Sequence, residues 1–283
     1  MVENITEYSL NDGLKVPSIG FGTYSLNGID GANRIKEAID LGYRLIDSAF
    51  NYENEGAVGE AVRKCSVSRE KLIITSKLPG RHHSYKEAIN TVEESLFRAG
   101  LDYYDLYLIH WPNPRINLYV EAWQAMIELK KRGLIRSIGV CNFMPEHLQT
   151  LIKETGVAPS INQIELHPYF NQEEQRTCNK EHGILTESWS PLGRGNSMLQ
   201  DEKIARIARI AETHKKSISQ VILRWHIQLG AIPLPKASSK EHQLDNLNIF
   251  DFELSEDEMK IISGLSREDG RTTNQDPRVY EEF

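Results

Sequence analysis

The sequence contains only three cysteines, and their placement argues against both a disulfide framework and a metal site. Cys65, Cys141 and Cys178 are far apart and lack the spacing of metal ligands. An odd and sparse cysteine count is typical of free thiols in a reducing compartment. We therefore expect a cytoplasmic protein whose fold depends on its apolar core and needs no covalent crosslinks.

Long hydrophobic runs and a surplus of positive charge are also missing. The longest apolar stretches have the length of a strand, well below the roughly 20 residues that a membrane-spanning helix needs. Residues 1–8 show neither the basic patch nor the apolar run of a secretory signal. The net charge of −7 disfavours nucleic acid or an anionic membrane as the main partner.

The glycine-rich fingerprint of the common dinucleotide-binding fold is incomplete. Gly20 and Gly22 begin a G-x-G sequence, but Ser25 stands where the third glycine belongs. If the protein binds a nicotinamide cofactor, other residues must therefore hold it.

The sequence does contain a regular alternation of short apolar runs with segments of helical spacing. The strand-like runs are 19–22, 45–47, 72–77, 104–110, 135–141, 161–163, 185–189 and 231–233. The helix-like segments are 31–41, 55–64, 85–99, 119–132, 145–154, 172–181, 202–214 and 217–228. Eight strand–helix units predict a (β/α)8 barrel, here a single domain over residues 1–283, although an open doubly wound sheet shares the alternation.

Additional elements are expected at both ends of this series. Residues 8–16 alternate around an Asp-Gly turn, which predicts a β-hairpin that caps the N-terminal mouth of the barrel. Residues 239–246 and 255–263 are predicted to form extra helices after the eighth strand.

Four polar residues are expected to converge at the other mouth, because reactive groups in such barrels lie at the C-terminal ends of strands. Asp47, Lys77 and His110 end the second, third and fourth predicted strands, and Tyr52 follows in the loop after Asp47. This set suits carbonyl reduction. A lysine ammonium would lower the pKa of a tyrosine proton donor, an aspartate would orient that lysine, and a histidine would donate to the carbonyl oxygen. Each residue alone also has a purely structural interpretation, so their combination carries the prediction.

The same residues lie in motifs that resemble those of the aldo-keto reductases, most closely the bacterial branch that includes 2,5-diketo-D-gluconate reductases. The motifs follow one another along nearly the whole chain. They are D-S-A-F-N-Y at 47–52, I-T-S-K-L at 74–78, Y-L-I-H-W-P at 107–112, I-G-V-C-N-F at 138–143, I-N-Q-I-E-L-H-P at 161–168, E-S-W-S-P-L-G at 187–193 and P-L-P-K-A-S at 233–238.

The resemblance implies a monomeric (β/α)8 barrel that uses NADPH, with NADH as a second acceptable cofactor, and that holds no metal. Its activity would be the reduction of aldehydes and ketones, either small reactive carbonyls or keto-sugars. Tyr52 would act as the general acid in a tetrad with Asp47, Lys77 and His110. The substrate would contact Tyr24, Tyr52, His110 and Trp111, and the short tail after Arg271 predicts an open pocket.

The resemblance also assigns residues to the cofactor. Asn142 and Gln163 match the pair that binds the nicotinamide carboxamide, which amide side chains can satisfy at both ends. Trp189 matches the aromatic residue on which the nicotinamide ring stacks. The alternatives are that Trp189 only fills the core and that Asn142 caps the following helix.

At the other end of the cofactor, Ser190 and Leu192 match residues along the pyrophosphate, and Lys236 matches the lysine at the 2′-phosphate. Asp245 and Asn246 match the pair at the adenine. The full predicted cofactor set is Gly22, Thr23, Asp47, Cys141, Asn142, Gln163, Trp189, Ser190, Leu192, Gly193, Lys236, Ala237, Ser238, His242, Asp245 and Asn246.

Three positions depart from the family pattern. Cys141 and Ala237 stand where serine is usual, and His242 stands where relatives that prefer NADPH carry arginine. A histidine has only a partial positive charge near neutral pH. We therefore expect a smaller preference for NADPH over NADH than is typical of the family.

Two other functions were weighed against the reductase. A sensor subunit of the same fold would bind NADPH but consume it very slowly. A metal-dependent barrel hydrolase would need ligands such as His110 and His167, yet the sequence contains no H-x-H or H-E-x-x-H spacing.

Overall fold

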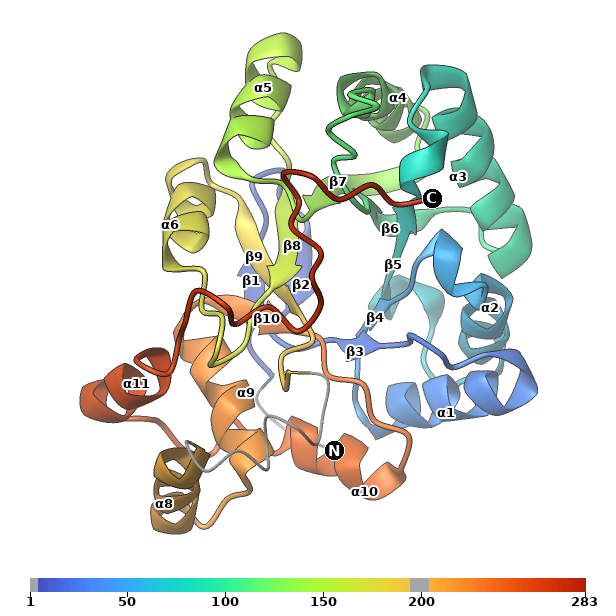
Figure 1. Ribbon diagram of the computed structural model, residues 1–283. Coiled ribbons are helices and arrows are strands. Elements are labelled where there is room, and N and C mark those ends of the chain that lie inside the picture. The colour runs from blue at the N-terminus through green and yellow to red at the C-terminus, as the bar shows by residue number, and fades with distance from the viewer. Residues whose placement is uncertain (1–4, 194–203) are drawn as a thin grey trace.

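The computed structural model describes residues 5–193 and 204–283, and its centre is a barrel of eight parallel strands (Figure 1). Their order in the sheet follows their order in the chain. The strands are β3 Phe21–Gly22, β4 Leu45–Asp47, β5 Ile73–Leu78, β6 Tyr104–Ile109, β7 Ile135–Cys141, β8 Ile161–Glu165, β9 Leu185–Trp189 and β10 Ala231–Pro233. The barrel prediction is confirmed, and the doubly wound alternative is wrong because such a sheet reorders its strands.

Backbone hydrogen bonds between the first and last strands close the barrel. Gly20 N donates to Pro233 O and Gly22 N donates to Pro235 O, each over 3.1 Å. A β-carbon on Gly20 would lie 2.5 Å from the side chain of Leu234, so a larger residue would push these strands apart. The glycines that begin an incomplete fingerprint therefore serve the closure of the barrel.

Helices form a ring around the strands (Figure 1). They are α1 Gly28–Leu41, α2 Glu55–Lys64, α3 Tyr85–Ala99, α4 Tyr119–Lys131, α5 Pro145–Thr155, α6 Glu173–Glu181, α8 Ala205–His214 and α9 Ile218–Gln228. The predicted helices agree with these bounds to within three residues, except that predicted residues 202 and 203 lie outside the described residues. The two extra helices are also confirmed, as α10 Lys240–Leu247 and α11 Glu256–Ser263.

The N-terminal mouth is covered by the predicted hairpin, whose strands β1 Glu7–Ser9 and β2 Lys15–Pro17 pair antiparallel. Leu10 and Val16 from this hairpin are buried in the same apolar cluster as Leu45, Leu106 and other residues inside the barrel. The hairpin thus fills one end of the barrel with apolar side chains, and the C-terminal ends of the strands are left for polar chemistry.

The C-terminal tail crosses that second mouth (Figure 1). At its start, Thr272 N and Oγ1 donate to Glu165 Oε1 over 2.7 and 2.6 Å, which ties the tail to the end of β8. Its last residues reach the loop that follows β6, where Asn113 binds the backbone of Glu282. Although short, the tail therefore narrows the mouth that was predicted to be open.

We expect Gly59→Ala to destabilise the protein. A β-carbon on Gly59, in α2, would lie 1.7 Å from the backbone oxygen of Ala99 at the end of α3, and such overpacking costs about 1–3 kcal/mol. The matched control is Gly56→Ala in the same helix. There the nearest atom is 3.5 Å away, so the higher helix propensity of alanine should stabilise by up to about 1 kcal/mol. Urea unfolding of both variants tests this, and equal stabilities would contradict it.

Candidate active site

The four predicted catalytic residues lie at the same mouth of the barrel and come from neighbouring elements. Asp47 is the last residue of β4, Lys77 lies near the end of β5, and His110 directly follows β6. Tyr52 ends the short 3-10 helix η1 Phe50–Tyr52, which follows β4. The register that pairs Asp47 with Thr75 places Asp47 and Lys77 on adjacent strands within reach of each other.

Lys77 and Asp47 form a buried ion pair. Lys77 is fully buried, and its Nζ lies 2.7 Å from both carboxylate oxygens of Asp47 and from the backbone oxygen of Ser48. Burial disfavours the ammonium, but the charge of Asp47 and its hydrogen bond, together with Tyr52 and Cys141, outweigh burial and raise the pKa of Lys77 above its usual value. Lys77 is therefore a permanent cation under the site.

Tyr52 lies against this cation. Lys77 Nζ is 5.1 Å from the centre of the Tyr52 ring, and the His110 ring meets Tyr52 edge to face with 5.9 Å between the ring centres. Burial raises the pKa of Tyr52 to about 12, because it outweighs the opposing effect of Lys77. The predicted lowering effect of Lys77 is present, but burial exceeds it, so the pKa of Tyr52 is raised overall instead of lowered. The phenol is protonated at neutral pH, which is the form that a proton donor needs.

A second buried carboxyl, that of Glu187, is connected to Asp47 through the side chain of Gln163. Gln163 Nε2 donates to Asp47 Oδ1 and to Glu187 Oε2, each over 2.9 Å. Burial, together with the charge of Asp47, raises the pKa of Glu187 to about 8, so this carboxyl is mostly neutral at pH 7. Glu187 was not predicted as a site residue. The sequence could have indicated Glu187 through its position in β9, two residues before Trp189, because alternate side chains share one face of a strand.

Asn142 and Trp189 form one wall of the site. Trp189 Nε1 donates to Asn142 Oδ1 over 2.8 Å, and Asn142 Nδ2 donates to His110 O over 3.1 Å. Asn142 (φ 60°) and Ser190 (φ 49°) adopt left-handed backbone conformations directly after β7 and β9. Non-glycine residues rarely do so outside functional or tightly constrained sites. The alternative that Asn142 caps α5 is wrong, since Met144 occupies that position.

Two predicted cofactor contacts lie behind this wall instead of in the pocket. Cys141 is fully buried among the apolar residues inside the barrel, and burial raises the pKa of its thiol well above the usual value. Thr23 is also fully buried, and its hydroxyl donates to Asp47 O over 2.9 Å. Both residues support the site from within the protein.

The predicted phosphate end contains a cation that the sequence did not indicate. Lys236 is exposed, and its Nζ donates to Ser25 Oγ over 2.7 Å. Arg34, on α1, donates to the backbone oxygen of Ser238. It escaped prediction because it lies some 200 residues away from the P-L-P-K-A-S motif. Ser239 caps α10, on which His242 and Asp245 are exposed while Asn246 is buried.

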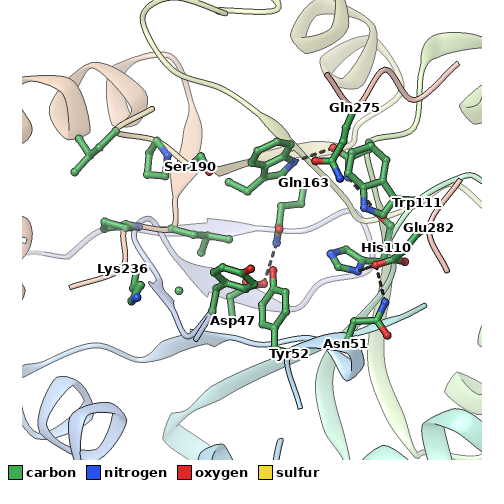
Figure 2. Close-up of a pocket in the computed structure, with 18 of the residues that line it drawn as sticks. Asp47, Asn51, Tyr52, His110, Trp111, Gln163, Ser190, Lys236, Gln275 and Glu282 are labelled. Carbon is green, nitrogen blue, oxygen red and sulfur yellow. Dashed lines mark hydrogen bonds and ion pairs between the residues drawn. The ribbon is translucent and has the colours of Figure 1, made fainter. Parts of the chain in front are cut away.

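These side chains surround a pocket of about 610 Å³ (Figure 2). The predicted residues that line it are Gly22, Tyr24, Asp47, Tyr52, His110, Trp111, Asn142, Gln163, Trp189, Ser190, Leu192 and Lys236. Lys77, Gly193, Ala237, Ser238, His242, Asp245 and Asn246 do not line it. The lining also includes Asn51 and three tail residues that were not predicted, Gln275, Tyr280 and Glu282.

The histidines considered as metal ligands have separate carboxylate partners. His167 Nε2 lies 3.1 Å from Glu165, whereas His110 Nδ1 lies 2.6 Å from Glu282. In residues 5–193 and 204–283, no three His, Cys, Asp or Glu side chains gather in a way that could hold a metal ion. None of the described helices is both long and apolar enough to cross a membrane.

Comparison with known proteins shows one family. Residues 18–267 match the model of the Aldo/keto reductase family. The chain is 48% identical to 2,5-diketo-D-gluconic acid reductase B of Corynebacterium sp. (strain SHS752001), with 99% of both chains covered. It is 44% identical to methylglyoxal reductase DkgA of Escherichia coli (strain K12), with 98% of both covered.

Solved structures agree with this result. A variant of Gox0644 in complex with NADPH superposes with a TM-score of 0.92 at 41% identity, over 99% of this chain and 100% of that chain. An aldo-keto reductase of Bombyx mori in complex with NADP superposes with a TM-score of 0.86 at 34% identity, over 93% of each chain.

We expect Glu187→Gln to change how stability depends on pH. The folded state raises the pKa of Glu187 from 4.5 to about 8. The contribution of its proton to stability is therefore complete below pH 4.5 and is lost as the pH rises through 8. Glutamine cannot ionise. The stability of the variant relative to the parent should therefore increase from pH 5 to pH 8, by at most about 1.4 kcal/mol per pH unit. Thermal unfolding across this range measures the difference.

The control is Glu268→Gln, at an exposed position. A parallel response of both variants would refute the assignment of the raised pKa to Glu187.

Proposed function

The chain belongs to the aldo/keto reductase family, and on this basis we propose that Tyr52, Asp47, Lys77 and His110 are its catalytic residues. It is an NADPH-dependent oxidoreductase that reduces aldehydes and ketones to alcohols. The observation that carries the residue assignment is the buried Lys77–Asp47 pair beside the ring of Tyr52. A buried cation beside a protonated phenol is what an acid catalyst of carbonyl reduction requires.

NADPH, when bound, supplies the hydride that adds to the carbonyl carbon. The carbonyl π electrons move to the oxygen, and Tyr52 Oη gives its proton to that oxygen, so the product is a neutral alcohol. This step leaves a phenolate, which burial alone would disfavour strongly. Lys77 stabilises the phenolate by its charge, and the bidentate contact with Asp47 keeps the ammonium in place.

The donor set of the pocket fits a nicotinamide at its inner end. Gln163 Nε2 already serves two carboxyl groups, which leaves its side-chain oxygen to accept from the carboxamide. Asn142 retains a second lone pair and a second hydrogen for the same group. Trp189 lines the pocket beside them and offers a face for stacking. Gly22 also lines the pocket, and a β-carbon there would lie only 3.1 Å from Leu234 O, so the position leaves little room for a side chain.

The outer end of the pocket fits a 2′-phosphate. Lys236 donates to Ser25 Oγ, and Arg34 donates to the backbone oxygen of Ser238, so both cations lie at residues 236–238. Two cations suit a phosphate monoester, for which lysine is a point charge and arginine a fork of donors. Arg34 thus supplies part of the charge that His242 lacks. The smaller preference for NADPH over NADH stays a prediction.

The substrate side of the pocket combines aromatic and polar groups. Tyr24 is exposed at the mouth, with its ring centre 5.1 Å from that of Tyr52, and the rings of Trp111 and Tyr280 lie 4.5 Å apart. Relatives are named for 2,5-diketo-D-gluconic acid and for methylglyoxal. We propose small, polar carbonyl compounds as substrates, including dicarbonyls and keto-sugars. We further propose that residues 1–283 act as one domain, as a monomer, in the cytoplasm.

We expect Tyr52→Phe to abolish most carbonyl-dependent oxidation of NADPH. The phenyl ring keeps the packing but has no proton to give, so kcat should fall by roughly 10²- to 10⁴-fold while the Kd of NADPH stays similar. The absorbance of reduced nicotinamide, followed with a panel of aldehydes and ketones, provides the measurement. Tyr85→Phe, on the outer helix α3, is the control. Full activity of Tyr52→Phe would overturn the catalytic assignment, and a parent protein that binds NADPH without consuming it would favour the sensor.

Arg34→Ala should weaken NADPH binding and leave NADH binding unchanged. Loss of one charged hydrogen bond to the 2′-phosphate should raise the Kd of NADPH roughly tenfold. Quenching of protein fluorescence without a carbonyl substrate gives both constants. Lys36→Ala removes the same charge from the same helix and should alter neither constant, because Lys36 pairs with Asp40. An equal loss for both cofactors in Arg34→Ala would contradict a role at the phosphate.

A further inference from the structure

The end of the chain brings a carboxylate into the catalytic pocket (Figure 2). Glu282 is only 7% exposed. Its Oε1 lies 2.6 Å from His110 Nδ1 and accepts from Asn51 Nδ2 over 2.8 Å, while its Oε2 accepts from Gly80 N over 2.9 Å. A side chain from the tail therefore contacts a proposed catalytic residue directly.

Other contacts anchor the tail independently of this carboxylate. The side chain of Asn113 binds both the oxygen and the N–H of Glu282, over 2.8 and 3.1 Å. Arg115 N donates to Glu281 Oε1 over 2.6 Å, and Tyr280 packs on Trp111. The backbone of the tail is thus held by the loop after β6, so anchoring alone does not require the Glu282 carboxylate.

The Glu282 carboxylate is ionised where it lies. Burial works against its charge, but His110 and the hydrogen bonds from Gly80 and Asn51 prevail and lower the pKa of Glu282 below its usual value. An ionised carboxylate can only accept hydrogen bonds, so the ring nitrogen that faces it must carry the proton. The contact is close but not yet well aligned for a hydrogen bond, which is common for catalytic contacts before the substrate binds.

This arrangement determines what the other ring nitrogen of His110 can do. With the proton fixed on Nδ1, a neutral imidazole has only a lone pair at Nε2 and cannot donate to a carbonyl oxygen. A protonated ring carries hydrogens on both nitrogens. We propose that Glu282 is a positioning residue that orients the His110 ring through Nδ1, so that the Nε2–H of the doubly protonated ring stabilises the developing charge on the carbonyl oxygen. This inference rests on the proposed carbonyl reduction.

Other charged groups around this pair do not replace Glu282. On the pocket side, Lys77 is neutralised by Asp47. Next to Glu282, burial lowers the pKa of His83 to about 4, so this ring is neutral above pH 5. Arg81 reaches the cluster only through Asn51 Oδ1, over 2.6 Å. Among the described groups, Glu282 is the anion in contact with His110.

The kinetic test compares Glu282→Gln with Glu281→Gln, its neighbour in the same tail. Loss of the anion should lower kcat roughly 10- to 100-fold, somewhat less than the loss of an entire oxyanion donor, while the Kd of NADPH changes less than about twofold. Glu281→Gln should keep kcat within about twofold. Glu282→Asp, which keeps the charge, should recover part of the loss. Equal kcat in Glu282→Gln and the parent, or equal losses in all three variants, would overturn the proposal.

A second measurement separates this proposal from the proposed function. The ring nitrogens of His110 are followed by NMR on labelled protein, without cofactor or substrate, in the parent and in Glu282→Gln. Without the anion, the Nδ1–H should lose its carboxylate acceptor, so its signal should shift from its position in the parent. Identical spectra would overturn the positioning role even if the enzyme is active. If the expected shift is observed but the protein reduces no carbonyl, the positioning role stands and the proposed function is rejected.

Discussion

The buried pair of Lys77 and Asp47 is the interaction on which the rest of the site depends. An ammonium removed from water is costly unless a carboxylate and further acceptors surround it, as Asp47 and the Ser48 oxygen do here. The partners belong to adjacent strands, so the register between β4 and β5 must be correct before the pair can form. The chemistry is therefore tied to the geometry of the barrel.

The same pair limits which other charges the barrel can hold. Gln163 links Asp47 to Glu187, and with one ammonium nearby only one of the two carboxyls is ionised at neutral pH. Glu187 is the neutral member because burial, together with the charge of Asp47, raises its pKa. The interior under Tyr52 is thus nearly neutral overall, and the field that acts on the phenol comes from Lys77 and Asp47 in close contact.

The tail completes the site from the opposite direction. It is tied at Thr272 to the end of β8 and at Glu282 to the loop after β6, so it spans the mouth between two barrel strands. Its residues supply a wall for the substrate and a charge for His110. In the proposed mechanism, the barrel provides the proton donor and the cofactor site, while residues of the tail complete the surroundings of His110.

The sequence by itself determined the barrel, its helices, the three polar strand ends and the tyrosine in the loop after the first of them, because strand and helix periods are local properties and the C-terminal ends of parallel strands meet at one mouth. Only the tertiary structure decided the raised pKa of Tyr52, the neutral Glu187, the buried Cys141 and the contacts of Arg34 and Glu282. These features depend on burial and on contacts between residues up to some 200 positions apart. No local pattern encodes such distances.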